Sequence, residues 1–557
     1  MLIMKTHYYR LLPLILAIPS SFLGGAESVS ADIIADPNAT GQQRATVLNT
    51  ANGLPLVNIQ TPSAAGVSHN LYRQFDVKQK GAILNNSRTN AQTQLGGWVP
   101  ANPWLATGSA RVILNEVNSN NPSLLQGYIE VAGSKAQVII ANPAGVTCDG
   151  CGFINTNRAT LTTGTPILNG GSLEAYRVQK GQISIEGKGL DARQTNYTDL
   201  IARAVKVNAG IWANDLKITT GSNQINAAHS QISKQPPTTT APNVAIDVGT
   251  LGGMYAGKIR LIGTESGVGV HNAGQIGAGS LSLNTNGYLD NSGSLNSTEK
   301  MTISSQQGIN NSGIIYTKAS AQLTTQGDIN NTNVIAALDD ATLIASGANS
   351  QISGTTNAIF AAGLNTNGTL QVASSNANLS LKASKAITSH GQHLAAYQQT
   401  HLSKAIDLSS SQTSAHSLHI AASEDTVNVH DASINALDTL TITTPKTIIS
   451  DNATISAKKL SLTATQLSNR NGELIQTGSD DLTLNVTGTL DNHQGRIASN
   501  SQNMNIEAVT LINTAGDITH AGDGQLQLTA TQLDGTAGSV QSNGQLSITA
   551  DTVILDE

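Results

Sequence analysis

The chain has 557 residues, a formal net charge of −6, 12% charged residues and only 3% aromatic residues. The charged share is about half that of an ordinary soluble protein, and no basic patch interleaves with aromatic residues, which argues against a nucleic-acid-binding protein. A globular domain fills its centre with large aromatics, whereas a thin β-solenoid does not need them, because its core is a narrow stack of Val, Ile, Leu and Ala.

Residues 1–31 are predicted to be a secretory signal peptide. Basic residues precede an apolar run at 11–18, and small residues offer a cleavage site after Ala31 or, alternatively, after Ala26. The run is too short to span a bilayer, and no later stretch is long and apolar enough, so we do not expect a helical membrane protein. Export would place the cysteines in an oxidising compartment.

The part of the chain from residue 32 to about 221 is the least repetitive. It holds all three tryptophans and both cysteines. Residues 70–77 and 81–87 read as alternating strands that end in an Asn-rich turn. Because the end of a helical β stack must be covered, the aromatics gathered here predict a cap or extra β elements.

Two Asn-Pro turns stand beside strand-like runs in this region. They are Asn121-Pro122 and Asn142-Pro143, with strands expected at 128–131 and 136–140. Asn-Pro initiates turns, because Pro fixes its own φ and pushes the preceding residue out of the helical region. By themselves, the two motifs indicate tight turns that shape the first coils.

The only two cysteines follow at once, as Cys148-Asp-Gly-Cys151. The pair could be a redox motif, half of a zinc site or a local disulfide. A structural zinc site requires four ligands and no second pair exists, while a thioredoxin-type motif opens a helix rather than lying between strands. A local disulfide that pins one turn is therefore favoured.

These motifs together resemble the secretion domain of the two-partner-secreted exoproteins of Gram-negative bacteria. That family includes filamentous haemagglutinins, haemolysins and contact-dependent inhibition toxins, and it carries the motifs Asn-Pro-Asn-Leu and Asn-Pro-Asn-Gly-Ile. The corresponding residues here are Asn121-Pro122-Ser123-Leu124 and Asn142-Pro143-Ala144-Gly145-Val146. Both differ from the family motif at the position of its second Asn. The run 152–156, Gly-Phe-Ile-Asn-Thr, also matches the family.

The resemblance and the composition divide the mature chain into three parts. The secretion domain is expected at 32–232. A Pro/Thr-rich break at 233–243 is expected to form a loop bulging from the stack, because strand-like sequence resumes immediately. The loop and a junction similar to that of the family occupy 233–274, and filamentous repeats occupy 275–557.

The last part of the chain repeats with a period near 20 residues. Asparagines recur at matching turn positions, first in Asn-x-Gly-like turns and later in Leu-x-Asn-x-x-Gly. They are Asn272, Asn291, Asn311 and Asn331, then Asn469, Asn492 and Asn513. Between about 340 and 450 the repeat is blurred.

A period near 20 residues with several short strands is typical of a β-solenoid, and the fold predicted is a right-handed parallel β-helix with an N-terminal cap and extra-helical β elements. The turn asparagines are expected to stack as a ladder, and the turn glycines to supply positive φ. About 21 residues per coil would give roughly 25 coils and a rod on the order of 120 Å.

No constellation in the sequence predicts a catalytic or metal site. His390-x-x-His393 and His416-x-x-His419 would suit a metal on a helix, but on strands an odd step separates the side chains, so solvated surface histidines are expected. Adjacent acidic pairs at 339–340 and 480–481 are split across the sheet in the same way. We therefore expect no enzyme, no cofactor and no metal.

The resemblance implies a protein secreted through the periplasm and the outer membrane to the cell surface. Its partner would be an outer-membrane β-barrel transporter whose periplasmic domains recognise the secretion domain, and its filament would serve adhesion or haemagglutination toward an unknown receptor or glycan. The alternatives are the stalk of a contact-dependent inhibition toxin that lacks its effector, a haemolysin, and more remotely a carbohydrate-active β-helix enzyme. Residues 545–557 are still solenoid-like, so the chain is expected to be a fragment, a truncated product or a short adhesin.

Overall fold

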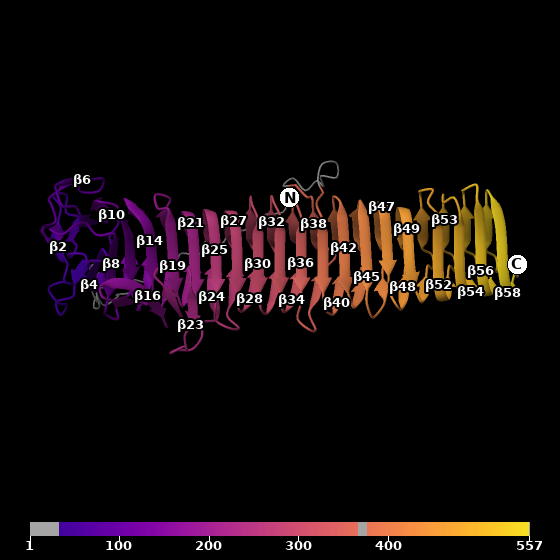
Figure 1. Ribbon diagram of the computed structural model, residues 1–557, viewed down its shortest axis with the longest axis horizontal. Coiled ribbons are helices and arrows are strands. Elements are labelled where there is room, and N and C mark those ends of the chain that lie inside the picture. Colours follow the sequence, from indigo (N-terminus) through magenta and orange to yellow (C-terminus); the bar gives the residue numbers. More distant parts are fainter. Residues whose placement is uncertain (1–32, 366–375, 556–557) are drawn as a thin grey trace, which may run out of the picture.

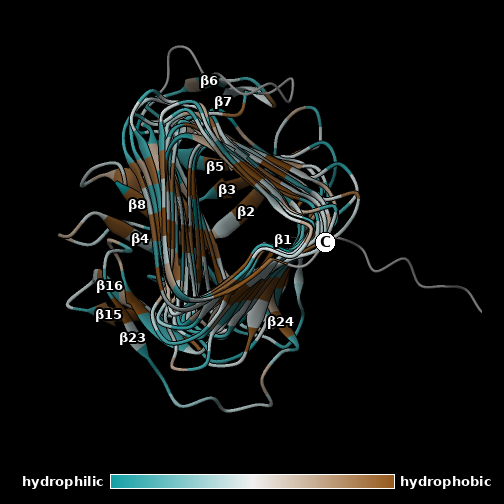
Figure 2. Cartoon of the chain, turned by 90° about the vertical axis from the view of Figure 1, so that its right-hand side faces the viewer, coloured by the Kyte–Doolittle hydropathy of each residue, from teal (hydrophilic) through white to brown (hydrophobic). Residues whose placement is uncertain are grey.

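The computed structural model describes residues 33–365 and 376–555, and the predicted signal peptide at 1–31 lies outside the described residues. The described chain winds into a rod of stacked coils (Figure 1). Seen along the rod, successive coils superimpose around one interior (Figure 2). The predicted all-β parallel solenoid is confirmed, since each coil strand pairs in parallel with the strand of the next coil.

Each coil has three faces, which we number in chain order. Strands confined to face 1 are β9 (Ser123–Leu125), β12 (Val146–Cys148), β17 (Gln182–Ile185), β20 (Ala204–Val207), β24 (Val244–Val248), β26 (Gly269–Asn272), β28 (Tyr288–Asn291), β31 (Gly308–Asn311), β34 (Asp328–Asn331), β37 (Gln351–Gly354), β40 (Ala386–Ser389), β43 (Ala405–Asp407), β46 (Val427–Asn428), β48 (Thr447–Ile449) and β50 (Gln466–Ser468). Strands confined to face 2 are β3 (Pro55–Asn58), β5 (Ala82–Asn86), β10 (Tyr128–Gly133), β13 (Cys151–Ile154), β18 (Leu190–Ala192), β29 (Ser294–Ser297), β32 (Ile314–Thr317), β35 (Val334–Ala337), β38 (Ile359–Ala362), β41 (Gln392–Ala395), β44 (Gln412–Ala415), β51 (Glu473–Gln476), β53 (Arg496–Ser499), β55 (Asp517–His520) and β57 (Ser539–Ser542).

Face 3 and the corners hold the remaining coil strands. Strands confined to face 3 are β4 (Val67–Phe75), β8 (Val112–Val117), β11 (Ala136–Ala141), β14 (Thr156–Thr162), β19 (Tyr197–Ala202), β30 (Met301–Ser305), β33 (Ala321–Thr325), β36 (Ala341–Ala345), β39 (Leu379–Ala383), β42 (Gln398–Ser403) and β45 (Ser417–Ala422). Longer strands that turn from face 2 into face 3 are β21 (Gly210–Thr220), β25 (Gly253–Gly263), β27 (Gln275–Thr285), β47 (Ser433–Thr443) and β49 (Thr454–Ala464). Those that turn from face 3 into face 1 are β52 (Leu482–Asp491), β54 (Met504–Ile512), β56 (Gln525–Asp534) and β58 (Gln545–Ile554).

The N-terminal end of the rod is capped, as the sequence predicts. Strand β1 (Ile33–Ala35) pairs antiparallel with β4, and β2 (Thr46–Asn49) pairs antiparallel with β3. Outside the coils lie a hairpin of β6 (Ala91–Thr93) and β7 (Gly97–Val99), the 3-10 turn η1 (Pro103–Leu105), and an antiparallel sheet of β15 (Thr165–Asn169), β16 (Ser172–Val178), β22 (Asn223–Asn226) and β23 (Ile232–Lys234) (Figure 2).

The core is a set of apolar columns, because the two-residue period of each strand sends alternate side chains inward. One column on face 3 joins five consecutive coils, and none of its side chains is more than 1% exposed. Its members, in register, are Leu283, Ile303, Leu323, Leu343 and Leu381. Aliphatic side chains suffice to fill so narrow an interior, which accounts for the low aromatic content.

Two ladders of buried asparagines line one corner of the rod. In the first, each amide nitrogen donates to the side-chain oxygen of the next coil, at 2.7 to 2.8 Å, through Asn272, Asn291, Asn311 and Asn331. In the second, Asn469, Asn492 and Asn513 are joined in the same way at 2.8 and 2.7 Å. Their amide groups also donate to turn carbonyls, so buried backbone acceptors are satisfied.

The turn glycines next to these ladders have a different role from the one expected. Gly293 and Gly516 do not adopt positive φ; in the second ladder that conformation falls on the preceding residue, such as Ala515 at φ 50°. Glycine is required because a Cβ at 516 would lie 2.2 Å from the carbonyl oxygen of Asn492 in the previous coil. The expectation that these glycines supply positive φ is therefore wrong, and close coil-to-coil approach is the reason for them.

The rod has fewer coils than expected. Twenty strands stack on face 3, which at about 4.8 Å per coil gives a length on the order of 95 Å. The expectation of roughly 25 coils assumed equal coils. Early coils are longer, since Val67 of β4 pairs directly with Val112 of β8 although the β6–β7 hairpin and η1 lie between them.

The blurred repeat between about 340 and 450 reflects a change in what fills the corner. Asn331, the last member of the first ladder, pairs in register with Gly354 of the next coil. A Cβ at 354 would lie 2.2 Å from Oγ of Ser389 on the following coil and 2.9 Å from the ring of Phe360, so glycine here makes room for both side chains. Phe360 in turn stacks on His393, with ring centroids 5.7 Å apart.

Neighbouring substitutions in the last ladder turn should have opposite effects on stability. Ala515→Gly should stabilise the chain by about 1 kcal/mol, because it relieves a left-handed alanine. Gly516→Ala should destabilise it by about 2 kcal/mol, because the new Cβ would collide with a carbonyl oxygen that cannot move. Urea unfolding of the purified chain checks both signs, and a destabilising Ala515→Gly would contradict the assignment of φ.

Candidate functional site

Both Asn-Pro motifs lie at the corner where face 3 passes into face 1, on successive coils. The first connects β8 to β9 and the second connects β11 to β12. β9 and β12 pair in parallel, with Ser123 opposite Val146 and Leu125 opposite Cys148. The two motifs therefore form one stacked pair of turns, although they are separated in the sequence.

Asn142 of the second motif is an internal brace. Its side chain is fully buried. The amide nitrogen donates to the carbonyl oxygen of Asn121 at 2.9 Å and to Oγ of Ser123 at 3.0 Å, and Oδ1 accepts from the N–H of Ala144 at 2.9 Å. Asn142 therefore closes its own turn and ties it to the first motif.

The first motif is held on its inner side by a buried carboxylate, and its outer side is exposed to solvent. The buried Oδ1 of Asp76 accepts a hydrogen bond from the N–H of Leu124 at 2.7 Å. Asn121 and Pro122 are exposed, and among the described residues no hydrogen bond of the Asn121 side chain is found. Sequence reasoning did not assign a role to Asp76, because no local pattern shows that its carboxylate accepts from a backbone N–H 48 residues away.

The outer surface of the stacked turns is uncharged. It consists of Asn121 and Pro122, with Pro143 and Ala144 partly exposed on the next coil. Gly145 brings the turn close to the following coil, because a Cβ there would lie 3.2 Å from the carbonyl oxygen of Gln182. Such a surface can offer apolar contact and one free amide, but no group that could act in acid–base chemistry.

Cys148 and Cys151 form a disulfide directly after these turns, between β12 on face 1 and β13 on face 2. Both cysteines are fully buried, and their Cα atoms are 5.3 Å apart. Because this bridge closes a very short loop, it restricts the unfolded chain little and adds little to the free energy of unfolding. Its main effect is to fix the corner between the two faces.

A buried ionic cluster fastens the outer sheet to face 3. Arg158 on β14 donates to both carboxylate oxygens of Asp199 on β19, and His229 lies 2.9 Å from the same carboxylate. Burial raises the pKa of Asp199, but the hydrogen bonds from His229 and Arg158 outweigh it, so the pKa is lowered overall. Asp199 and His229 lie 41 and 71 positions from Arg158 in the sequence and share no motif with it, so sequence reasoning missed them.

Of the histidines considered in the sequence, His393 is not a surface residue. It is fully buried, with ring nitrogens 2.8 Å from Oγ of Ser389 and 3.1 Å from Oγ1 of Thr413. The expectation of solvated histidines is wrong here, because face 2 turns the second histidine of the pair inward. His390, His416 and His419 are partly exposed.

Burial controls the protonation of this core. It lowers the pKa of His393 to about 3, with a smaller contribution from His390, and it also lowers the pKa of the buried His401 nearby. Both residues are therefore neutral in the folded chain at neutral pH.

The free energy of unfolding should fall as the pH drops from about 6.5 toward 3. In that range the two histidines bind protons in the unfolded chain but stay neutral in the folded chain. His393 alone should cost on the order of 4 kcal/mol at the acid end of that window. The variant His393→Gln should flatten this slope in urea unfolding, whereas His430→Gln, at a partly exposed histidine, should not. Equal slopes for all three proteins would contradict a neutral buried His393.

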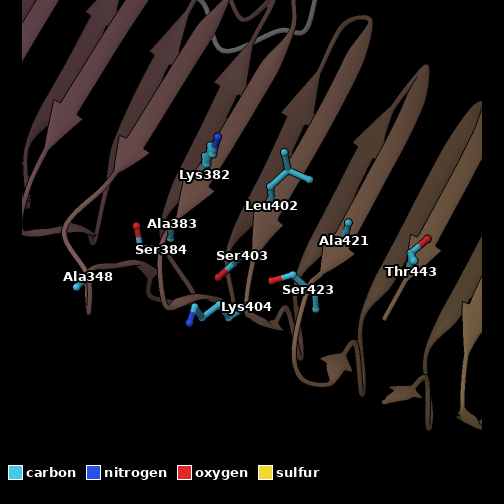
Figure 3. A pocket seen from close by; sticks show the side chains of 11 residues that line it. Ala348, Lys382, Ala383, Ser384, Leu402, Ser403, Lys404, Ala421, Ser423 and Thr443 are labelled. Atoms are coloured by element: carbon cyan, nitrogen blue, oxygen red, sulfur yellow. The ribbon is translucent and has the colours of Figure 1, made fainter. Parts of the chain in front are cut away.

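One of the surface hollows lies over face 3 and does not hold a reactive centre. A shallow groove of about 760 Å³ crosses β39, β42 and β45, and its lining includes Lys382, Leu402 and Lys404 (Figure 3). The two ammonium groups do not point toward one another (Figure 3). Lys404 instead pairs with Glu424 at 3.0 Å, and both side chains are exposed.

Within residues 33–365 and 376–555, no three or more His, Cys, Asp or Glu side chains gather in a way that could hold a metal ion, and no helix is long and apolar enough to cross a membrane.

Comparison with known families divides the chain into two parts. Residues 31–296 match the family model of the TPS secretion domain. Residues 276–333, 413–494 and 477–554 match the model of the haemagglutinin repeat. The stacked Asn-Pro turns and the disulfide fall in the first part, and both asparagine ladders run through or into the second.

Individual relatives were also found. The chain is 47% identical over 505 residues to "Toxin CdiA" of Yersinia pestis, which covers 90% of this chain and 15% of that protein. It is 49% identical over 262 residues to "tRNA nuclease CdiA-2" of Burkholderia pseudomallei (strain 1026b). That match covers 46% of this chain and 8% of that protein. The chain thus spans less than a sixth of the length of these curated relatives. Among solved structures, a filamentous hemagglutinin secretion domain is 26% identical with a TM-score of 0.42, covering 67% of this chain and 99% of that one.

Proposed function

Because the chain belongs to the two-partner secretion exoproteins, with a TPS secretion domain ahead of haemagglutinin repeats, we propose that the stacked Asn-Pro turns form a surface recognised by its outer-membrane transporter. The partner is a β-barrel transporter with periplasmic domains, and the contact is made by Asn121, Pro122 and the outer edge of the second turn. Asn142 acts through the fold, by holding the first turn in place.

The observation that carries this proposal is the unequal burial of two similar motifs. The side chain of Asn142 is buried and makes its hydrogen bonds inside the protein. The side chain of Asn121 is exposed, and among the described residues its amide makes no hydrogen bond. A rigid, uncharged turn next to a disulfide-pinned corner offers a preorganised contact, which reduces the entropy lost on binding.

The rod itself suits export followed by folding outside the cell. Strand pairing joins each coil to its two neighbours, so a formed end can template the next coil. The folded rod would then project from the cell surface or be released, as a filament for adhesion. The receptor would meet a surface that is mostly uncharged and polar.

A second candidate function is the stalk of a contact-dependent inhibition toxin. It is favoured by the 90% of this chain that matches a protein named as a toxin. Sequencing the gene beyond the codon for Glu557, followed by growth competition between producing and non-producing cells, would separate the two functions. Killing of the neighbouring cells would favour the stalk.

The contact and bracing roles can be separated by single substitutions. Asn121→Ala should lower transporter-dependent export roughly tenfold, through loss of about 1.4 kcal/mol of recognition, without changing hydrogen exchange of the purified chain. Asn142→Ala should lower export and also speed exchange at 119–148, because removing a buried hydrogen-bonding amide costs about 1–3 kcal/mol. Asn310→Ala, at an exposed asparagine outside the secretion domain, is the matched control.

Export is measured as the amount of chain in the medium of a Gram-negative host, with and without the cognate transporter. Export of Asn121→Ala at the wild-type level, while Asn142→Ala is impaired, would make the turns structural only. Export of the wild type without any transporter would overturn the proposal.

A further inference from the structure

Aromatic side chains that are exposed or partly exposed gather in one outward column on face 2. In a chain with so few aromatics, three of them occupy the same register position on nearby coils. The column, in pairing order, is Trp212, Tyr255, Gly277, Asn296 and Tyr316. Trp212 is 37% exposed and Tyr255 38% exposed. This column is distinct from the Asn-Pro turns, which lie at another corner of the rod.

The ring of Tyr255 is held in a fixed position. Trp212 stacks on one side of it, with ring centroids 6.4 Å apart and an interplanar angle of 19°. Its hydroxyl donates to Oε1 of Gln275 at 3.2 Å. On the other side the next register position is Gly277, so no side chain covers the ring there.

Tyr316, three coils from Tyr255, is also fixed. Its hydroxyl donates to the carbonyl oxygen of Leu364 at 3.1 Å. Leu364, only 8% exposed, packs over Ala336 and Ala361 on the coils beyond. The end of the column past Tyr316 is thereby covered, and the stretch between the two tyrosines stays open.

A groove of about 450 Å³ lies between the two tyrosines. Three coil spacings separate them, or about 14 Å. Gly277, Ala278 and Gly279 form a floor without bulky side chains, and Asn296 rises from the middle. The groove therefore has two aromatic walls, a flat floor and one exposed amide.

We propose that this groove binds a neutral, pyranose-containing glycan. The C–H face of a pyranose ring is attracted to the negative face of an aromatic ring, and Asn296 can both donate to and accept from sugar hydroxyls. Apolar walls with a few fixed polar groups are typical of small-ligand sites. Lys318 at the rim is the only charged residue that lines the groove, and no carboxylate does, so the lining does not select a charged ligand.

The structure argues against a peptide strand in this groove. Every strand beneath it is already paired on both sides, so its backbone offers no free edge for strand addition. A second copy of the chain remains a rival occupant, and the experiment separates it from a glycan.

Gly277 provides a direct way to fill the site. A Cβ at this position would meet only the Tyr255 ring, at 3.4 Å, which is an ordinary contact. Thr is favoured on an exposed strand. Gly277→Thr should therefore place atoms beside the open face of Tyr255 while leaving the coil folded.

The test is saturation-transfer NMR titration of the purified chain with lactose, maltotriose and chitotriose. At least one sugar should bind the wild type, and Tyr255→Ala, Asn296→Ala and Gly277→Thr should each weaken binding about tenfold or more. Tyr397→Ala removes a tyrosine of similar exposure, 43%, on another part of the rod and should have no effect.

The outcomes are decisive, and none depends on the proposed role in export. Failure of all three sugars to bind, or unchanged binding by Gly277→Thr with an unaltered melting curve, would overturn the proposal. Sedimentation velocity on the same proteins tests the rival occupant: a wild-type dimer that Gly277→Thr disrupts would identify the groove as a self-interface and not a glycan site.

Discussion

The whole structure depends on one constraint, which is that each coil must pair in register with the coil before it. Parallel pairing along three faces repeats every side-chain position at the same place on the next coil. An inward polar side chain must therefore find its partner one coil away, and asparagine meets this requirement because its amide both donates and accepts. Where coils touch most closely, the backbone of one coil occupies the space of a Cβ in the next, and only glycine fits.

The same constraint separates support from contact in the secretion domain. Consecutive coils bring the two Asn-Pro turns together, but only one face of that pair can be outside. Asn142 lies on the inner side and braces the first turn, while Asn121 and Pro122 lie on the outer side. The open column on face 2 has the same origin: register places Tyr255 and Tyr316 in line, with a glycine between them. Both sites are thus consequences of how the coils stack.

The sequence was sufficient to predict the fold class, the cap, the outer β elements and the repeat, because the two-residue alternation and the turn signals are local. It failed where the outcome depends on the next coil. The glycines of the ladder turns are required by a carbonyl oxygen of the preceding coil. His393 points inward from face 2, where it stacks on Phe360 of the neighbouring coil. Likewise, the two Asn-Pro motifs look equivalent in sequence, and nothing local tells which asparagine faces inward. The Arg158–Asp199–His229 cluster joins distant segments and carries no local signal.

The most direct test of register-based stacking is to delete one whole coil and compare it with a half coil. Removing residues 308–327 should bring Asp328 opposite Tyr288 and Asn331 opposite Asn291, since β28, β31 and β34 pair in series. Circular dichroism and thermal unfolding should then remain close to wild type, within about 3 °C. Removing only residues 318–327 breaks the order of the faces and should unfold the flanking coils. If both deletions are tolerated, or if the whole-coil deletion unfolds the rod, in-register stacking is not what holds this protein together.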